Sequence, residues 1–301
     1  MAKACVIILH YKNEQDTKDC LSSLFRSKSG SGLFSTIIVA NSPLRLPADF
    51  SEHNGLKTIL IQNKENLGYA QGNNIGIRKA FELKSKFIIL LNNDTVLPEN
   101  LISDLIEEAD KHSQAGIFSP KIYFAPGDEY HRERYQKKDL GKVIWYAGGI
   151  VDWQNVQAKH RGVDEIDQKQ YEEKIDTDFA TGCCMLIRRE VAEKAGFFDE
   201  KYFLYYEDVD YCVRVKKLGF RIEYNPCSYL WHKNASSSGK AGSEIHQYYQ
   251  SRNRLYFGNK YAKLRAKKSF FIQSLKEIWK NDVAGKAALD YYLGKMGKRK
   301  S

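Results

Sequence analysis

Four short apolar runs dominate the first 111 residues of the chain, with helix-like stretches after the first, third and fourth runs and a Pro/Ser loop after the second. The stretches between them place apolar residues at helical spacing, as Cys20, Leu21 and Leu24 illustrate. Strands that alternate with helices pair in parallel, and the helices cover both faces of the sheet. The pattern therefore predicts an α/β fold with strands at Cys5–Tyr11, Ser35–Asn41, Leu56–Gln62 and Lys86–Asp94.

The chain becomes polar and less regular between Ala125 and Asp178. One strand is predicted there, in WYAGGIVDW, and two more follow at Phe179–Arg189 and Phe220–Pro226. Between these two, VDYCVRVKKLG is predicted to form a helix that ends at Gly219. The change of regularity indicates a change of role within one domain.

The net charge of +10 is concentrated near one end of the 301-residue chain. Twelve basic and three acidic residues lie between Lys260 and Lys300, which leaves a net charge of +9 there and +1 elsewhere. In the same region, Phe270, Phe271, Leu275, Ile278 and Trp279 fall near one helical face. This pattern is typical of a helix that lies on an anionic membrane surface. A helix packed on the domain with its basic side in water explains it equally well.

The rest of the composition favours a cytoplasmic protein. No apolar run reaches the roughly eighteen residues that a membrane-spanning helix needs, and the first residues, MAKACVIILHYKN, do not resemble a signal peptide. The six cysteines are scattered without a CxxC pair, so core packing is favoured over zinc binding or disulfides.

Polar residues follow the predicted parallel strands, where such sheets bind their ligands. These positions are the loop after Tyr11, the Asn41-Ser42 pair, and Asn92-Asn93-Asp94. A carboxylate at the end of a buried strand is well placed to hold Mg²⁺ or Mn²⁺ together with substrate phosphates. A turn that caps the next helix is the simpler alternative for the last group.

The segment NLGYAQGNNIG, from Asn66 to Gly76, opens a predicted helix with glycines at four-residue spacing. Glycines let a ligand approach the backbone, and a helix N-terminus favours phosphate. The spacing matches neither the dinucleotide-binding nor the P-loop pattern. Close packing of the helix on the sheet competes with ligand binding, above all at Gly76.

Three acids lie in the aromatic stretch FLYYEDVDYC. Asp210 and Arg214 have the i, i+4 spacing of a helical ion pair, which indicates a structural role for Asp210. Glu207 and Asp208 fall at the helix start, where the macrodipole favours anions. Two adjacent acids are more than capping requires, so one of them is a candidate general base.

Two further groups could meet a metal ion or a phosphate. His232 follows a strand and precedes a Ser/Gly-rich stretch, although a lone histidine is more often a packed or surface residue. Arg252 and Arg254, in YYQSRNRLYF, could bind phosphate or could simply face solvent.

In their order along the chain, these segments resemble the family 2 inverting glycosyltransferases of the GT-A fold. They are most similar to the bacterial branch that contains rhamnosyltransferases and related polysaccharide enzymes. The resemblance spans roughly residues 4 to 257, and its most specific part runs from Thr181 to Gly219. The matching segments are VIILHYKN, ENLGYAQGNNIGI, LLNNDT, TGCCMLIRREVAEKAGFFDEKYFLYYEDVDYCVRVKKLGF and the following His232.

The resemblance implies a mixed, mostly parallel sheet flanked by helices, with a C-terminal helical extension. It implies a GT-A domain over 1–258, with a nucleotide-sugar half at 1–124 and an acceptor half at 125–258. The basic amphipathic tail is then 259–301. The enzyme would be a metal-dependent hexosyltransferase-type protein that transfers a sugar with inversion.

Site residues follow by position from the same resemblance. Asp208 matches the usual general base, and Glu207 would orient the site or the acceptor. Asp94 matches the last acid of the metal motif, Asn92 stands where its first acid often is, and His232 matches a histidine that touches metal or diphosphate in some members. The donor would be bound by His10, Tyr11, Asn13, Asn41, Asn66, Gly68, Gly72, Asn73 and Asn93.

Two departures from the family pattern affect the expected substrate. Ala40 stands where many members carry an acid that contacts the nucleotide base, so the choice between uridine and thymidine is open. Asn92 leaves fewer charged metal ligands, so the cation would be held mainly through the diphosphate. The candidate donors are dTDP-rhamnose and UDP-sugars, and the acceptor is a glycan or polyprenyl-linked glycan.

The first hypothesis is therefore a cytoplasmic glycosyltransferase, free or attached to the inner membrane face, that builds surface polysaccharide. A nucleotidyltransferase that makes the sugar nucleotide also suits an α/β nucleotide fold, but the chain lacks a Gly-rich triphosphate loop near its start. A non-catalytic protein that binds nucleic acid or membrane through the tail is the third hypothesis. The balanced charge of the remaining chain argues against nucleic acid as a partner.

Overall fold

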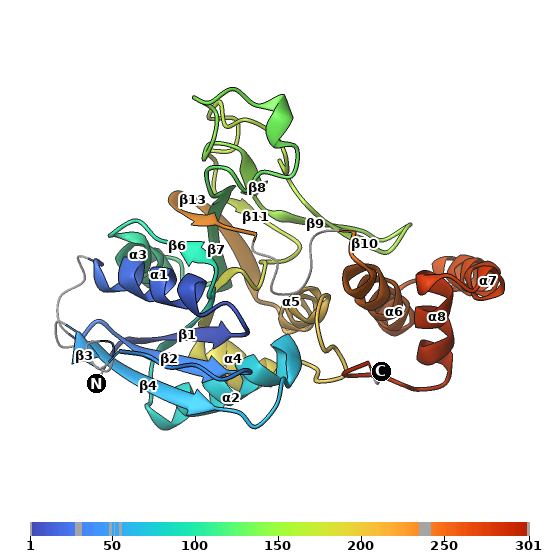
Figure 1. Cartoon of the computed structure of the whole chain (residues 1–301), viewed down its shortest axis with the longest axis horizontal. Coiled ribbons are helices and arrows are strands. Elements are labelled where there is room, and N and C mark those ends of the chain that lie inside the picture. The colour runs from blue at the N-terminus through green and yellow to red at the C-terminus, as the bar shows by residue number, and fades with distance from the viewer. Residues whose placement is uncertain are drawn as a thin grey trace.

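A mixed, mostly parallel sheet forms the centre of the protein (Figure 1), as a computed structural model shows. The structure describes residues 2–27, 32–47, 50, 52–53, 56–234 and 242–299. Within these ranges eleven strands form the sheet, in the order β11-β13-β7-β12-β5-β1-β2-β4-β3, with β6 beside β13 and β8 beside β7. The strand bounds are β1 Ala4–His10, β2 Phe34–Ala40, β3 Glu52–His53, β4 Leu56–Gln62, β5 Phe87–Asn92, β6 Thr95–Val96, β7 Ala115–Phe124, β8 Ile144–Tyr146, β11 Ile175–Asp176, β12 Cys184–Arg188 and β13 Arg221–His232.

The predicted α/β fold is confirmed in its first half. Strands β1, β2, β4 and β5 pair in parallel, and most residues of β1, β2 and β5 are apolar and buried, whereas β4 is partly exposed. Helices α1 and α3 lie on one face of this part of the sheet, and α2 and α4 lie on the other (Figure 1). The helices are α1 Glu14–Phe25, α2 Gly68–Glu82, α3 Leu101–Lys111, α4 Arg189–Ala195 and α5 Glu207–Lys217.

The second half departs from the predicted strands in three places. The predicted strand at Phe179–Arg189 begins only at Cys184, and the residues before it are irregular. The predicted strand at Phe220–Pro226 continues to His232, because an irregularity between Asn225 and Tyr229 accommodates the proline. WYAGGIVDW contains two strands, β8 and β9 (Gly149–Asp152), and β9 pairs with β10 (Gln157–His160) outside the main sheet.

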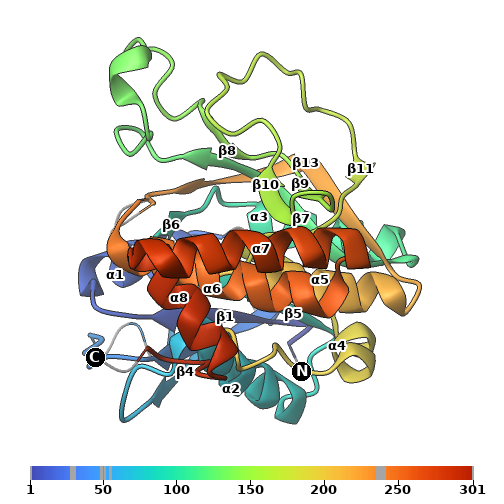
Figure 2. The same cartoon turned by 90° about the vertical axis from the view of Figure 1, so that its right-hand side faces the viewer.

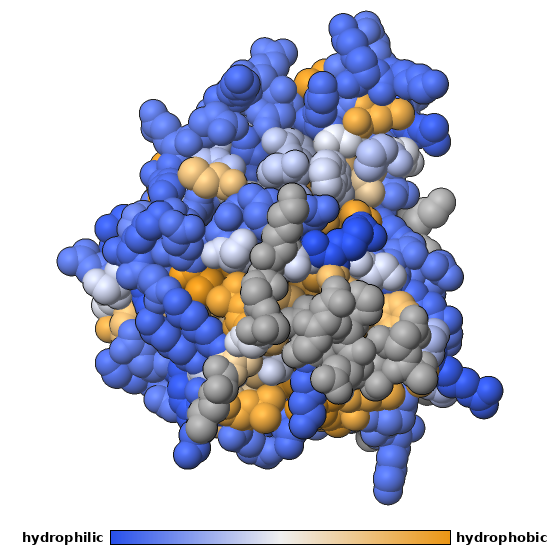
Figure 3. Space-filling model, turned by 90° about the vertical axis from the view of Figure 1, so that its left-hand side faces the viewer, coloured by the Kyte–Doolittle hydropathy of each residue, from blue (hydrophilic) through white to orange (hydrophobic). Residues whose placement is uncertain are grey.

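Three helices follow the sheet: α6 Glu244–Tyr261, α7 Leu264–Lys280 and α8 Val283–Tyr292. Helix α6 runs past the predicted tail boundary at 258, and the tail contains two helices. Helix α7 lies along the outer side of α6, and α8 packs against both (Figure 2). Among the described helices, none is long and apolar enough to cross a membrane. On the face of the molecule opposite α7, the rim is mostly hydrophilic (Figure 3).

Candidate active site

A cavity of about 900 Å³ opens where β1, β2 and β5 end. The loop before α5, the start of α5 and helix α6 form its other wall, so it lies between the two halves of the sheet domain. The structure brings most of the predicted site residues into this one cavity. They are Tyr11, Asn41, Asn66, Gly68, Asn92, Asn93, Asp94, Glu207, Asp208 and His232.

Four predicted donor-binding residues do not line the cavity, and each has a structural contact instead. The ring nitrogens of His10 lie 2.7 Å from Thr17 Oγ1 and 3.1 Å from Ser42 Oγ. Asn13 caps helix α1 by accepting from the Asp16 amide. Gly72 packs α2 on the sheet, since a Cβ there would lie 2.4 Å from Leu9. Asn73 donates to the Tyr69 carbonyl.

The glycine segment that opens α2 lies partly in the cavity wall and partly against the sheet. Gly68 lines the cavity with a φ of +82°, and a Cβ there would lie 2.4 Å from the Phe203 carbonyl oxygen. The Asn41 side chain fixes this turn by donating to the Gly68 carbonyl at 3.0 Å. Gly76 serves helix packing, because a Cβ there would lie 2.4 Å from Ile7.

Asp94 and His232 meet in one corner of the cavity. His232 Nε2 lies 3.2 Å from Asp94 Oδ1, and both side chains are buried. The main chains are joined as well, since the Lys233 amide donates to the Asp94 carbonyl at 2.8 Å. His232 Nδ1 is buried without a hydrogen-bond partner in the described chain. A carboxylate and an imidazole that converge on one cavity suit a cation such as Mn²⁺, which accepts oxygen and nitrogen ligands.

Asn92, the third predicted metal ligand, and Asn93, which was predicted to bind the donor, contribute less directly. Asn92 lines the cavity, and its main-chain N–H donates to the Cys183 carbonyl as part of the sheet. The Asn93 side chain donates to Thr17 Oγ1 at 2.9 Å, which directs it toward α1. The structure thus supports Asp94 and His232 as the strongest ligand candidates of the predicted set.

Asp208 is partly buried in the opposite wall of the cavity. Its Oδ2 accepts from the Gly182 amide at 2.9 Å and its Oδ1 from the Val209 amide at 2.8 Å, which fixes the carboxylate. Burial raises the pKa of Asp208 despite these hydrogen bonds. A fixed carboxylate with a raised pKa suits a general base near neutral pH.

Glu207 is more deeply buried than its neighbour, and its Oε2 has no hydrogen-bond partner in the described chain. Burial first, and the adjacent Asp208 second, raise its pKa well above the usual range. The two adjacent acids therefore sit in distinct environments, and Glu207 holds its proton more tightly than a free glutamate does.

The backbone before α5 is strained where it delivers these acids to the cavity. Tyr205 and Tyr206 adopt left-handed conformations with φ of +71° and +73°, which is uncommon for bulky residues. Asn253 on α6 holds this loop, donating to the Leu204 and Tyr205 carbonyls at 2.8 and 2.9 Å. Sequence analysis missed Asn253, which lies in a polar helix without a recognisable motif.

Tyr69 and Gly182 form a chain of hydrogen bonds that holds the Asp208 carboxylate in place. The Tyr69 hydroxyl donates to the Gly182 carbonyl at 2.5 Å, and the amide of the same glycine donates to Asp208. A Cβ at position 182 would lie 2.5 Å from the Tyr69 hydroxyl. The TGCC segment therefore requires glycine here, a constraint that its sequence signalled but our sequence analysis did not use.

Trp145 and His160 are further cavity residues that sequence analysis missed. The Trp145 ring contacts His160 and His232 edge to face, with centroids 4.3 and 4.6 Å apart. Burial lowers the pKa of His160 to about 4, so His160 is neutral at physiological pH. Trp145 thus packs against the His232 ring and fixes its plane.

Asp210 is fully buried and plays the predicted structural role. Its carboxylate accepts from Arg214 at 2.9 Å, as the spacing predicted, and also from Lys260 at 2.6 Å and the Tyr261 hydroxyl at 2.8 Å. These contacts tie α5 to the end of α6, so the two helices of this wall of the cavity are held together.

Asp210→Asn is therefore expected to destabilise the fold by about 3–5 kcal/mol, because it leaves two cations beside an uncharged buried group. Chemical denaturation of the purified protein measures this change. Asp199→Asn removes another Lys260 contact at a partly exposed position and is expected to cost less than about 1 kcal/mol. Equal losses of stability in both variants would contradict the conclusion that Asp210 connects α5 to α6.

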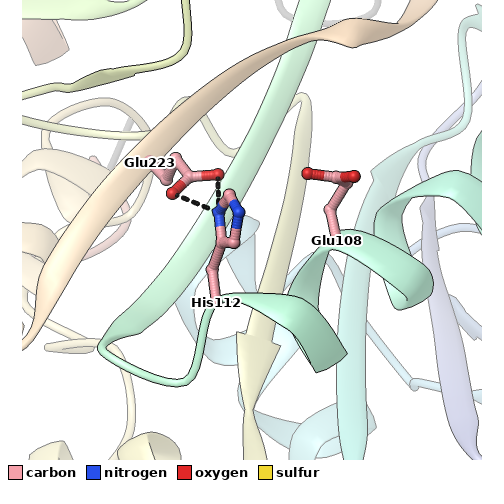
Figure 4. A group of neighbouring side chains, drawn as sticks. All are labelled: Glu108, His112 and Glu223. Carbon is pink, nitrogen blue, oxygen red and sulfur yellow. Dashed lines mark hydrogen bonds and ion pairs between the residues drawn. The ribbon is translucent and has the colours of Figure 1, made fainter.

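A second group of metal-type side chains lies outside the cavity. Glu108, His112 and Glu223 gather at the opposite end of β13 from His232, with ligand atoms within 4.8 Å of one another (Figure 4). His112 Nδ1 is 2.8 Å from both Glu223 oxygens, and Glu108 pairs with Lys174 and Lys111. These contacts already balance the acids, so we assign no cation to this group.

Comparisons with known proteins agree with this geometry. A family model described as "Glycosyltransferase like family 2" matches residues 3–258. A Haloferax volcanii protein named low-salt glycan biosynthesis hexosyltransferase Agl10 is 26% identical over 257 residues, covering 84% of this chain and 75% of that protein. A Mycobacterium tuberculosis N-acetylglucosaminyl-diphospho-decaprenol L-rhamnosyltransferase is 27% identical over 189 residues, which are 60% of each chain.

Solved structures support the fold at lower identity. GalNAc-T7 with UDP, GalNAc and Mn²⁺ matches with a TM-score of 0.58 and 17% identity, over 76% of this chain and 43% of that one. The mannosyltransferase PcManGT from Pyrobaculum calidifontis, solved with GDP-Man and Mn²⁺, matches with a TM-score of 0.55 and 13% identity, over 95% of this chain and 73% of that one. With the family match over residues 3–258, these likenesses show that the chain belongs to glycosyltransferase family 2 and has the GT-A fold.

Proposed function

We propose that the protein is a metal-dependent inverting glycosyltransferase with Asp208 as general base. The observation that carries this proposal is that Asp208 lines the same 900 Å³ cavity as the Asp94–His232 corner. One wall can then hold the donor diphosphate while the other receives the acceptor hydroxyl. The donor half is 1–124, the acceptor half is 125–258, and 259–301 is a helical extension.

The proposed reaction is a single displacement. The acceptor hydroxyl oxygen forms a bond to the anomeric carbon, on the face opposite the diphosphate. The bond from that carbon to the diphosphate oxygen breaks, and its electron pair leaves with the nucleoside diphosphate. The hydroxyl proton passes to Asp208. Asp94 and His232 would hold a Mg²⁺ or Mn²⁺ ion, which offsets charge on the leaving diphosphate.

The substrate class follows from chemistry and from the relatives. Tyr11, Asn41 and Asn66 line the cavity where β1 and β2 end, which suits a nucleoside diphosphate sugar. Ala40 is buried and offers the base no charge, so both dTDP-rhamnose and UDP-sugars remain candidate donors. The names of the two relatives favour a glycan or polyprenyl-linked glycan as acceptor.

A thermal-shift panel of sugar nucleotides tests this function. We expect one nucleotide class to raise the melting temperature, and to do so only with Mn²⁺ or Mg²⁺ present. At a hundredfold excess over Kd a ligand adds about 2.7 kcal/mol of stability, which is readily detected. NMR of the product made from the matching donor should then show an inverted anomeric centre. No shift with any sugar nucleotide, or a retained configuration, would contradict the proposal.

The exposed side of α7 supports attachment to an anionic membrane surface. Trp279 is 90% exposed, and Phe271, Ile272 and Leu275 are about half exposed. Lysines flank these apolar side chains on the same helix, at 263, 267, 268, 276 and 280. An apolar stripe bordered by lysines fits the interface of an anionic bilayer, so we propose that the enzyme works at the inner membrane face.

Removing two of these lysines, with Lys276→Gln and Lys280→Gln, is expected to weaken vesicle binding. Each basic residue near an anionic surface contributes about 1 kcal/mol, so the pair accounts for roughly a thirtyfold change in affinity. Co-sedimentation with phosphatidylcholine vesicles containing about a third phosphatidylglycerol measures it. Leu60→Ser with Leu218→Ser removes exposed apolar residues elsewhere and should have no effect. Unchanged or salt-insensitive binding of the lysine variant would rule out this surface.

A further inference from the structure

The segment after α8 returns to the active-site cavity (Figure 1). It turns at Gly294 and Gly297, whose φ values are +70° and +74°, and then places Lys298 and Arg299 in the cavity wall. The Gly297 amide donates to the Lys201 carbonyl at 3.0 Å, and the Arg299 amide donates to the Tyr249 hydroxyl at 2.9 Å. The segment is therefore attached to both α6 and the loop before α5.

Arg252 on α6 fixes this segment from the inside. Its guanidinium is fully buried and donates to the Lys295 carbonyl at 3.1 Å and the Gly297 carbonyl at 2.7 Å. Its ring neighbours Tyr248 and Tyr249 lie 5.3 and 5.0 Å away. Burying a cation is costly unless it is well paired, and no carboxylate pairs with Arg252 in the described residues. The buried cation instead holds the backbone that presents Lys298 and Arg299.

The position of this basic pair is coupled to the catalytic acids. The residue next to Arg252 is Asn253, which holds the Leu204 and Tyr205 carbonyls just before Glu207. One turn of α6 thus positions both the acids and the basic segment. A group bound by Lys298 and Arg299 would be placed at a fixed distance from Asp208.

Both side chains can exchange their carboxylate partners, and the Arg299 guanidinium also lies 4.4 Å from the centroid of the Tyr248 ring. Lys298 Nζ lies 3.2 Å from Glu65 Oε2, and Arg299 Nη1 lies 2.9 Å from Glu244 Oε1. Both glutamates are more than 60% exposed, and exposed ion pairs of this kind contribute little to stability. A phosphate offers stronger, charge-assisted hydrogen bonds to lysine and can accept two from arginine. The pair can therefore move from its glutamates to a phosphate at small cost.

The neighbouring side chains indicate which phosphate this is. Phe203, Leu204, Tyr205, Ile245 and Tyr249 line the cavity beside the basic pair, and Ile245 is 52% exposed. The donor diphosphate joins two polar groups, a nucleoside and a sugar, and neither suits an apolar wall. A prenyl diphosphate joins a sugar to an apolar chain. Its anionic group would meet Lys298 and Arg299 while its chain lies against the apolar side chains.

We propose that Lys298 and Arg299 bind the diphosphate of a prenyl-linked acceptor and so present its sugar hydroxyl to Asp208. This inference rests on the proposed function, because it assigns the acceptor of that reaction. It gives the segment after α8 a role in substrate binding that is separate from the membrane contact of α7.

Calorimetric titration of geranyl diphosphate, with UDP and Mn²⁺ already present, tests the proposal. Lys298→Ala with Arg299→Ala is expected to weaken binding of geranyl diphosphate at least roughly tenfold, since charged hydrogen bonds contribute about 1.5–3 kcal/mol each. UDP affinity should not change. Lys137→Ala with Lys138→Ala removes the same charge at adjacent exposed positions outside the cavity and should bind geranyl diphosphate as the parent does.

Three results would overturn the proposal. The double variant could bind geranyl diphosphate as tightly as the parent, or it could lose UDP affinity to the same extent, which would assign the pair to the donor. Inorganic pyrophosphate could bind as tightly as geranyl diphosphate, which would make this a site for free phosphates. If the parent instead binds neither UDP nor dTDP with Mn²⁺, the proposed function fails, while the geranyl diphosphate titration still reports on this wall.

Discussion

Asp208→Asn is expected to lower the rate of sugar transfer by roughly 10²–10⁴-fold, the usual contribution of a general base. The amide keeps the size of the side chain, but its single oxygen can accept from only one of the Gly182 and Val209 amides, and it cannot take a proton from the acceptor. The measurement is kcat with the donor found in the thermal-shift panel. Donor affinity should stay unchanged, because Asp208 belongs to the wall opposite Asp94.

Glu207→Gln is the matched control for this change. Burial and the adjacent Asp208 raise the pKa of Glu207 well above the usual range, which favours its protonated form, and glutamine imitates that form. We expect less than a tenfold loss of kcat, which is well short of the general-base range. Full activity of Asp208→Asn, or an equal loss in both variants, would show that Asp208 is not the base.

The raised pKa of Asp208 also determines how activity should change with pH. Asp208 acts as a base only when deprotonated, so kcat/KM should rise with pH through its raised pKa and then level off. The acid limb should lie above the pH of about 3.9 at which an ordinary aspartate titrates. Asp208→Asn should remove this limb from whatever activity remains.

Stability should change with pH in the opposite direction. A carboxyl whose folded-state pKa is raised binds its proton more tightly in the folded chain than in the unfolded chain. Its contribution to the free energy of unfolding therefore falls as the pH rises above the pKa of about 4.3 that glutamate has in the unfolded chain. Glu207→Gln should raise the melting temperature at pH 8 by about 2–4 °C for each kcal/mol recovered, and the gain should shrink toward pH 4.

The sequence was informative wherever local patterns determine structure. The apolar runs of β1, β2 and β5, each followed by polar residues, located one wall of the cavity and the side chains of Tyr11, Asn41 and Asp94. His10 shows the limit of this reasoning, because neighbouring side chains of a strand point in opposite directions. Tyr11 faces the cavity, whereas His10 is buried against Thr17 and Ser42.

Long-range contacts account for what the sequence did not reveal. Arg252 could be read as a phosphate ligand or as a solvent-facing residue, and the structure shows neither. Its partners are backbone carbonyls of residues 295 and 297, which no local pattern brings to α6. For the same reason, the basic tail indicated a surface but not that Lys298 and Arg299 lie in the active-site wall.

Asp94→Asn is expected to abolish the benefit that Mn²⁺ or Mg²⁺ gives to donor binding. Asp94 is the carboxylate of the Asp94–His232 corner, and the neighbouring Asn92 and Asn93 bring no charge to a cation. We expect the UDP Kd measured with Mn²⁺ to rise at least roughly tenfold, as for loss of a charge-assisted contact of about 1.5 kcal/mol or more. Chelation of divalent cations should also stop transfer by the parent enzyme.

Measuring UDP binding by the parent and by Asp94→Asn, each with and without Mn²⁺, separates a role in cation binding from a structural role. If Asp94 binds UDP through the cation, the two proteins should bind UDP equally in the presence of a chelator and differ only when Mn²⁺ is added. A variant that is weaker by the same factor in both conditions would show instead that Asp94 shapes the cavity. Asn92→Ala should retain most of the Mn²⁺ effect, because an uncharged side chain adds little to the attraction of a hard cation. Since Asp94 lies in the turn between β5 and β6 and His232 ends β13, loss of the cation effect in Asp94→Asn would also explain how the proposed donor half and acceptor half are held around one diphosphate.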